Sequence, residues 1–164
     1  MASGRFSVHL ARSKKDLAAA QALRFEVFFD EFKAKALTDQ HSAGLDSDKF
    51  DDFCEHLLVV DNEQDKKVIA TTRLLLSSQK PVDLSYIAQE EFSIPLLDAV
   101  QDNCMEVGRS CVHKDYRDGK AIQFLWRGIT KLIFDNDIRY LFGCASFHST
   151  DIDEIAYELA YLHH

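Results

Sequence analysis

The sequence has few of the residues that form linkers, membrane spans and basic surfaces. Two prolines and six glycines among 164 residues leave little material for low-complexity linkers. No apolar run approaches the roughly 20 residues that a membrane-spanning helix needs. The formal net charge of −8 offers no basic excess to displace counterions from a phosphate backbone, so nucleic acid is not an expected partner.

Signals for secretion and for metal binding are also missing. The first residues, MASGRFSVHLARSKKD, contain no apolar signal core, and we therefore expect a cytoplasmic protein. The length suits one domain over residues 1–164, large enough to bury a core without disulfides. The four cysteines form no CxxC pair and have no histidine at a zinc-finger spacing. We expect no metal site and reduced, mostly buried thiols at Cys54, Cys104, Cys111 and Cys144.

Hydrophobic periodicity predicts an α/β or α+β domain with a mixed sheet. Alternating or apolar runs predict strands at residues 6–11, 56–61, 68–76, 104–112 and 139–147. The second and third of these read as an antiparallel hairpin, and a polar, acidic loop covers residues 38–52. Helical patterns predict helices at residues 17–33, 86–92, 96–102, 121–137 and 153–162. Asp16 is the expected cap of the first helix, and Ile122 is expected on the inward face of the fourth.

Charged residues stand inside several of these apolar elements. Arg24 lies on the apolar flank of the first helix, Arg73 lies in the strand TTRLLL, and Glu106 and Arg109 lie in CMEVGRSCV. Burying such groups is costly unless they are paired or functional. Strict alternation places Glu106 and Arg109 on opposite faces, whereas a bulge at Gly108 would bring both to one face. A structural ion pair and a functional site are both consistent with this pattern.

Acidic residues are concentrated in the loop that follows the first helix, at Asp46, Asp48, Asp51 and Asp52. Arginine binds a carboxylate through a bidentate fork, and an aspartate binds an amine. Arginines and aspartates together therefore suggest a site for a zwitterion. Further along, the turn RDGKA (117–121) joins a strand to a helix, where backbone N–H groups can hold a phosphate. It lacks the second glycine of a phosphate cradle, so an ordinary βα turn explains it as well.

Longer strings carry a resemblance to a known family. RFEVFFDEF, KFDDFCEHLLVVD, TTRLLL and EVGRSCVHKDYR occur in an order similar to that of autoinducer-synthase-like N-acyltransferases of the GNAT superfamily. EVGRSCVHKDYR, FLWRGI, YLFGCASF and the terminal YLHH more closely resemble bacterial ornithine-lipid N-acyltransferases. The resemblance runs from about residue 6 to residue 164. It implies a mostly antiparallel GNAT-like sheet flanked by helices, with a splayed strand pair for the donor.

The resemblance also implies a reaction, a donor and an acceptor. A (3-hydroxy)acyl chain would pass from acyl carrier protein to the α-amino group of ornithine, giving lyso-ornithine lipid. The donor is an acyl-pantetheine, on acyl carrier protein or on coenzyme A, and no cofactor is expected to be bound permanently. A lipid product implies peripheral contact with the inner face of the membrane. Enzymes of this branch continue past YLHH, so we expect closing strands of the fold to be missing from this chain.

The resemblance implies roles for individual residues. Glu106 and Arg109 would be catalytic, with Glu106 taking a proton from the attacking ammonium. The acceptor would be bound by Arg24, Phe28, Asp51 and Arg73. The donor and its pantetheine arm would be bound by Ser110, Cys111, Val112, Arg117, Gly119 and Lys120, with a backbone N–H near Ser110 polarising the thioester carbonyl. Homoserine-lactone synthases carry a second acid where this chain has Cys54, which points away from S-adenosylmethionine as the acceptor.

Charge gives a separate indication of the donor. Residues 109–140 carry a net charge of +3 and the remainder of the chain −11. Acyl carrier proteins are acidic, so a basic rim would steer one towards the pantetheine entrance. An ordinary solvent-exposed helix face would show the same excess of basic residues.

Two other functions fit the sequence. One is an N-acyl amino acid or N-acyl-homoserine-lactone synthase, and the other is a catalytically inactive GNAT-like binding module.

Overall fold

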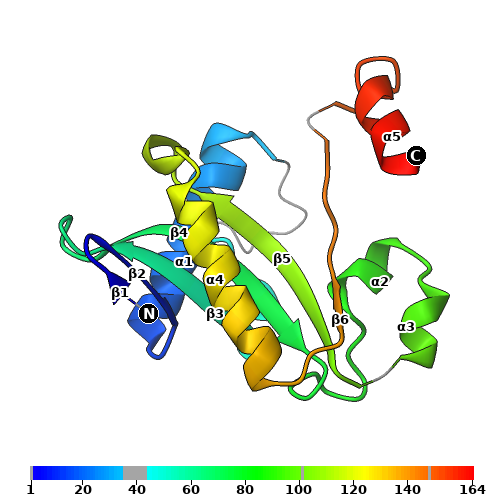
Figure 1. The fold of residues 1–164 in the computed structure, drawn as a ribbon, viewed down its shortest axis with the longest axis horizontal. Helices are drawn as coiled ribbons and strands as arrows, with labels where there is room; N and C mark the ends of the chain where they lie inside the picture. Colours follow the sequence, from blue (N-terminus) through cyan, green and yellow to red (C-terminus); the bar gives the residue numbers. More distant parts are fainter. Residues whose placement is uncertain (1, 35–43, 101, 148) are drawn as a thin grey trace.

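The computed structural model describes residues 2–34, 44–100, 102–147 and 149–164, and shows one twisted sheet with helices on both faces (Figure 1). The strands are β1 (Ala2–Ser3), β2 (Phe6–Leu10), β3 (Glu55–Asp61), β4 (Lys67–Leu76), β5 (Cys104–Val112) and β6 (Tyr140–Phe142). The helices are α1 (Lys14–Phe25), α2 (Ile87–Glu91), α3 (Pro95–Ala99), α4 (Lys120–Asp135) and α5 (Ala156–His163). No helix in these described ranges is long and apolar enough to cross a membrane.

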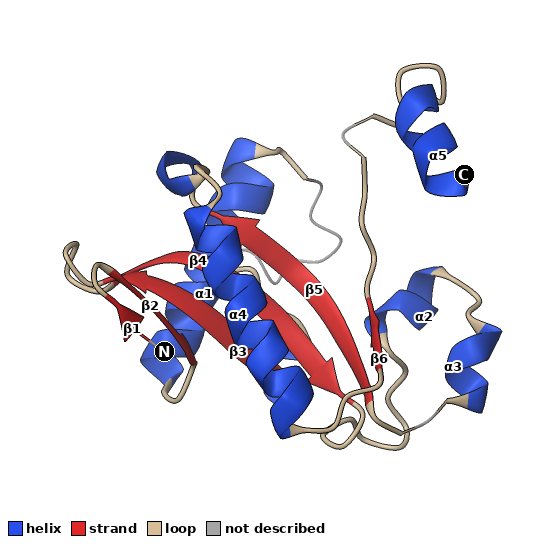
Figure 2. Ribbon diagram, in the orientation of Figure 1, coloured by secondary structure: helices blue, strands red, loops and turns tan. Residues whose placement is uncertain are grey.

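The sheet is mixed and mostly antiparallel, as predicted. Its strands lie in chain order from β1 to β6, and every neighbouring pair is antiparallel except β5 and β6. The predicted hairpin of β3 and β4 is confirmed. Side chains of β3 alternate between the two faces, because Leu57 packs in the cluster that contains the α4 residue Leu125, whereas Leu58 packs against Ala20 of α1. Helices α4 and α1 therefore cover opposite faces (Figure 2).

The first helix begins with a different cap from the one expected. Ser13, in extended conformation, accepts a hydrogen bond from the Asp16 N–H at 3.1 Å, and the Asp16 carboxylate accepts one from the Ser13 N–H. This is a capping box, so Asp16 lies inside the helix at its third position and the prediction that it caps the helix was wrong. The predicted single helix over 17–33 is instead α1 followed by a π-helical turn at Glu26–Glu31.

Strands β5 and β6 pair over three residues and then separate. The paired residues are Cys104–Glu106 with Tyr140–Phe142, and beyond them the chain after β6 runs away from β5 (Figure 1). Gly143 follows β6 directly, at the point where the two strands separate, and a Cβ added to it would be 2.2 Å from the carbonyl oxygen of Val107. The buried strand expected over 139–147 is therefore only β6. This pair supplies the splayed strands that the resemblance implied.

Several other expectations need correction. Ile122 is 39% exposed, because the buried stripe of α4 runs through Leu125, Ile129 and Leu132 instead. Cys144 is exposed, since the chain has left the sheet there. All four cysteines are free thiols, and Cys104 and Cys111 are buried. The helices expected near 86–92, 96–102 and 153–162 are present as the shorter α2, α3 and α5, and the predicted loop over 38–52 lies partly outside the described residues.

The irregularity expected in β5 is present, one residue further along the chain. Gly108 pairs normally with Arg73, and Cys111 pairs with Thr71, so two residues of β5 oppose the single Thr72 of β4. Arg109 takes a positive φ of 52°, which is unusual for a residue with a side chain. The bulge is therefore at Arg109 rather than at Gly108.

Candidate active site

An ion-pair cluster fills the space between α1, the acidic loop and β4. At its centre is Asp51, whose carboxylate accepts hydrogen bonds from Arg24 Nη1 at 3.0 Å and from Arg24 Nη2 at 2.9 Å. Gln21 Nε2, one turn earlier on α1, donates to the same carboxylate at 2.9 Å. The side chains of Arg24 and Asp51 are 1% and 4% exposed. The helix thus delivers two side chains of one face to a single buried acid.

The strand β4 adds a second guanidinium to this cluster. Arg73 Nη1 donates to Asp51 Oδ1 at 2.8 Å and to Asp48 Oδ1 at 2.6 Å, and its side chain is 2% exposed. Burial alone would raise the pKa of Asp51, but hydrogen bonds from Arg24 and Arg73 outweigh it and hold that pKa well below its usual range. Asp51 is therefore ionised at any physiological pH.

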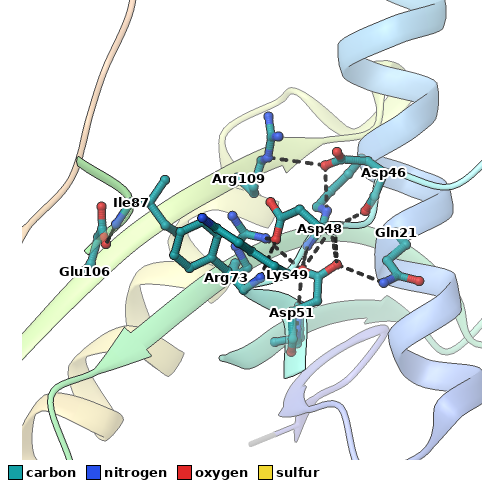
Figure 3. A network of polar contacts seen from close by, with 12 residues as sticks. Gln21, Asp46, Asp48, Lys49, Asp51, Arg73, Ile87, Glu106 and Arg109 are labelled. Atoms are coloured by element: carbon teal, nitrogen blue, oxygen red, sulfur yellow. Dashed lines mark hydrogen bonds and ion pairs between the residues drawn. The ribbon is translucent and has the colours of Figure 1, made fainter. Parts of the chain in front are cut away.

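A third arginine closes the cluster from the strand bulge. Arg109 Nε lies 3.4 Å from Asp46 Oδ2, and Asp46 also lies 2.9 Å from Arg24 Nε. The Arg109 guanidinium is 5.6 Å from the centre of the Phe28 ring, which is a cation–π contact. Figure 3 shows side chains converging from α1, the acidic loop, β4 and β5, among them Gln21, Asp51, Arg73 and Arg109. The structure thus brings together Arg24, Phe28, Asp51, Arg73 and Arg109, all of which were predicted as site residues.

Glu106 lies beside the cluster and is held by different partners. Its carboxylate oxygens accept hydrogen bonds from the backbone N–H groups of Ile87, at 2.8 Å, and Ala88, at 2.7 Å, at the start of α2. Burial raises the pKa of Glu106, although these two N–H groups and the charge of Arg73 oppose the rise. A carboxylate with a raised pKa is a better proton acceptor than an exposed glutamate.

A pocket of about 410 Å³ lies along the C-terminal half of β5. Its lining includes five of the six predicted donor residues, namely Ser110, Cys111, Val112, Arg117 and Gly119, together with Phe28. Burial raises the pKa of the Cys111 thiol to about 12, so this cysteine packs as a neutral group. The pocket therefore adjoins the arginine cluster through Phe28.

The turn into α4 is less open to a phosphate than its sequence indicated. Lys120, the sixth predicted donor residue, does not line the pocket. Its N–H donates to the Asp118 carboxylate at 3.1 Å, and its ammonium pairs with the same carboxylate at 2.9 Å. Arg117 makes a bidentate pair with Glu31 at 2.5 and 2.6 Å. Two basic groups of the expected rim are thus neutralised by neighbouring acids, a pairing the sequence did not reveal.

A second pocket, of about 510 Å³, lies between α2, α3 and the chain around β6. Its lining is mostly apolar and includes Ala88, Leu97, Phe142 and Cys144. Because the Ala88 N–H also binds Glu106, this apolar pocket begins next to that carboxylate. Sequence reasoning missed the pocket, since its walls come from three segments with no common motif. It also missed Gln21, whose position on the same helical face as Arg24 was the available signal.

Comparison with known proteins identifies the family. Residues 23–127 match the family model described as an acetyltransferase (GNAT) domain, which covers more than half of the chain. The chain belongs to the GNAT acetyltransferase family. The GNAT fold is also shared with solved structures, among them a coenzyme A-dependent acyl-homoserine lactone synthase, BjaI, with SAM and isopentyl-CoA. That match has a TM-score of 0.64 at 21% identity and covers 93% of this chain and 72% of that one.

Curated relatives with sequence similarity to this GNAT chain are longer than it. The L-ornithine N(alpha)-acyltransferase of Rhodobacter capsulatus is 34% identical over 163 residues, covering 97% of this chain and 63% of the relative. The enzyme of the same name from Brucella abortus is 35% identical over 167 residues, covering 98% of this chain and 59% of the relative. The chain thus spans about three-fifths of the length of these relatives.

Proposed function

We propose that residues 1–164 form the GNAT domain of an L-ornithine Nα-acyltransferase, which moves a 3-hydroxyacyl chain from acyl carrier protein to the α-amino group of ornithine. The observation that carries this proposal is the buried arginine–aspartate cluster, which lies beside a donor pocket and next to Glu106. The names of the relatives from Rhodobacter capsulatus and Brucella abortus agree with it. Location in the cytoplasm, with contact to the inner face of the membrane, follows from the lipid product and belongs to the same proposal.

The charge of the cluster supports a cationic amino acid as the acceptor. Its three arginines are balanced by Asp46, Asp48 and Asp51, and Glu106 adds one further carboxylate. With Glu106 ionised the site therefore has one negative charge in excess. Ornithine carries two ammonium groups and one carboxylate, so its net charge of about +1 neutralises the site. A neutral amino acid such as glycine would leave that excess charge unbalanced.

The two pockets support an acyl-pantetheine donor. Beyond Glu106 the edge of β5 diverges from β6, so the side of residues 108–111 that faces away from β4 is open to a pantetheine arm lying in the 410 Å³ pocket. The acyl chain then enters the apolar 510 Å³ pocket, which begins at Ala88 beside Glu106. In this proposal the thioester carbonyl lies between the pockets, where a backbone N–H near Ser110 would polarise it.

The chemistry needs no covalent enzyme intermediate. Glu106 accepts a proton from the α-ammonium, directly or through water, and the free amine attacks the thioester carbonyl carbon. The C–N bond forms and the C–S bond breaks. The attacking nitrogen gives its second proton to the departing thiolate, which leaves as the pantetheine thiol, and Glu106 returns its proton to solvent. Burial of Glu106 favours its role as the base because it raises the pKa of the carboxyl.

The turn before α4 favours a carrier-protein donor over coenzyme A. The Lys120 N–H, which could bind a pyrophosphate, already donates its hydrogen bond to the Asp118 carboxylate, and this carboxylate repels other anions. Acyl carrier protein presents a single phosphodiester at this point, so Asp118 repels it less strongly than it repels the pyrophosphate of coenzyme A. Lys114 is exposed and lies near the Arg117–Glu31 pair at the pocket, so it would face the acidic carrier.

A homoserine-lactone synthase is the second candidate, because the fold is shared with such enzymes. Cys54 argues against it. Burial raises the pKa of this thiol to about 12, so the position holds a neutral group where those synthases carry an acid. A sulfonium acceptor would lose that charge partner.

Product analysis tests the proposal. The protein is incubated with 3-hydroxyacyl carrier protein and, in separate reactions, with ornithine, glycine, tyrosine and S-adenosylmethionine, and products are identified by mass spectrometry. We expect a conjugate with ornithine. A preferred conjugate with another acceptor would replace the proposal with the corresponding synthase, and carrier binding without any product would identify an inactive binding module.

A further inference from the structure

We propose that Asp48 and Arg109 are the residues that contact the acceptor amino acid, Asp48 through the acceptor's distal ammonium and Arg109 through its carboxylate. This inference rests on the proposed function. It changes the roles that the resemblance implied, because Asp51, Arg24 and Arg73 then become positioning residues. Asp51, Arg24 and Arg73 are buried and already paired with one another, whereas Asp48 and Arg109 still expose polar atoms to a substrate.

The carboxylate at the centre of the cluster, that of Asp51, is saturated. Asp51 accepts hydrogen bonds from Arg24, Arg73 and Gln21, and its side chain is 4% exposed. Arg24 is equally enclosed, between Asp51 and Asp46. Displacing these partners would leave a charge buried without compensation, at a cost far above what a substrate contact returns. A substrate therefore meets the rim of the cluster and not its centre.

Asp48 is the acid at that rim. Its side chain is 25% exposed, whereas those of Asp46 and Asp51 are 1% and 4% exposed. Its Oδ1 is held by Arg73 Nη1 at 2.6 Å and by the Phe50 N–H at 2.8 Å. No described residue hydrogen-bonds to Oδ2. The carboxylate is thus fixed through one oxygen and presents the other to a cation.

Arg109 is the matching cation at the rim. Its side chain is 38% exposed, and it contacts the cluster only through Nε, at 3.4 Å from Asp46. Within the described ranges its two terminal nitrogens have no hydrogen-bond or ion-pair partner. The guanidinium is steadied over the ring of Phe28, which lines the donor pocket. A fixed guanidinium with a free fork is the arrangement that binds a carboxylate bidentately.

Comparing two acceptors isolates the role of Asp48. Norvaline has the carbon skeleton of ornithine without the distal ammonium. We expect Asp48→Asn, which keeps an acceptor oxygen for Arg73, to lower kcat/KM for ornithine roughly 10- to 100-fold relative to that for norvaline. Asp52→Asn is the matched control, because Asp52 is exposed and lies in the same turn. An ornithine-to-norvaline ratio equal to that of the wild type would overturn the assignment of Asp48.

Arg109→Lys keeps the charge and removes the fork. Because both amino acids carry a carboxylate, we expect KM to rise at least about tenfold for both, with the ornithine-to-norvaline ratio preserved. A loss confined to kcat would show that Arg109 does not bind the acceptor. If the wild type acylates neither amino acid, the proposed function fails, and calorimetric titration decides the inference separately. Tighter binding of ornithine than norvaline, lost in Asp48→Asn, would uphold it, and equal binding would refute it.

Discussion

Asp51 is the residue whose removal tests the ion-pair cluster most severely. Asp51→Asn is nearly isosteric and keeps one acceptor oxygen. It removes the negative charge shared by Arg24 and Arg73, whose side chains are 1% and 2% exposed. Arg24 retains Asp46 and Arg73 retains Asp48, so each guanidinium keeps one partner. Arg109 also pairs with Asp46, so the substitution leaves three arginines, two of them buried, with only the carboxylates of Asp46 and Asp48.

The expected loss can be estimated from this geometry. Removing one partner of a buried ion pair costs about 3–5 kcal/mol. Because Asp46 and Asp48 remain, we place Asp51→Asn at the lower end, about 3 kcal/mol. For a domain of this size, that corresponds to a fall in Tm of about 6–12 °C. Asp52→Asn, an exposed change in the same turn, is the control and should stay within about 0.5 kcal/mol of the wild type.

Urea unfolding followed by circular dichroism measures this difference, and its pH dependence gives an independent check. The pKa of Asp51 is lower in the folded protein than the ordinary value of about 3.9. Its stabilisation is therefore complete above about pH 4 and is lost as the pH falls towards the folded-state pKa. The gap between wild type and Asp51→Asn should narrow below pH 4. Equal stability of the two proteins at pH 7 would refute a structural role for the cluster.

Three further variants test the base, the strand splay and the acyl pocket. Glu106→Gln should lower kcat about 10²- to 10⁴-fold and abolish the acid limb in the pH profile of kcat/KM. In the wild type this limb should lie above the ordinary glutamate pKa of about 4.3, because burial raises the pKa of Glu106. Near-normal turnover of Glu106→Gln would show that Glu106 is not the base. Gly143→Val places a Cβ against the carbonyl oxygen of Val107, and we expect a loss of about 1–3 kcal/mol in urea unfolding, whereas an unchanged midpoint would contradict the close approach. Cys144→Phe narrows the apolar pocket at an exposed position, so turnover of a long-chain thioester should fall about tenfold relative to that of a butanoyl thioester. An unaltered ratio would show that the acyl chain binds elsewhere.

Periodicity predicted the frame of the fold because the sheet separates two faces. Alternate residues of β3 pack against different helices, and this pattern is visible in sequence. The ends of elements were harder. The cap at Ser13 depends on a reciprocal bond with Asp16, and β6 stops where the chain leaves β5, so neither boundary follows from hydrophobicity.

The candidate site was predictable in part for a similar reason. Arg24, Arg73 and Glu106 were conspicuous as charges in apolar elements, and all three are buried. Their partners were not, because Asp51 meets Arg24 across 27 positions of chain and Glu106 is held by backbone N–H groups that carry no sequence signal. The exposure of Asp48 and the position of the bulge at Arg109 depend on tertiary packing and needed the structure.

Acylation of isotopically labelled ornithine shows whether the protein acylates ornithine and at which nitrogen. Ornithine labelled with ¹⁵N at the α-amino group is incubated with the protein and a 3-hydroxyacyl carrier protein, and the amide product is fragmented in a mass spectrometer. We expect a single acyl-ornithine product with the label in the amide bond. Unlabelled amide nitrogen, which would place the acyl group on the δ-amino group, or the absence of any ornithine conjugate, would contradict this expectation.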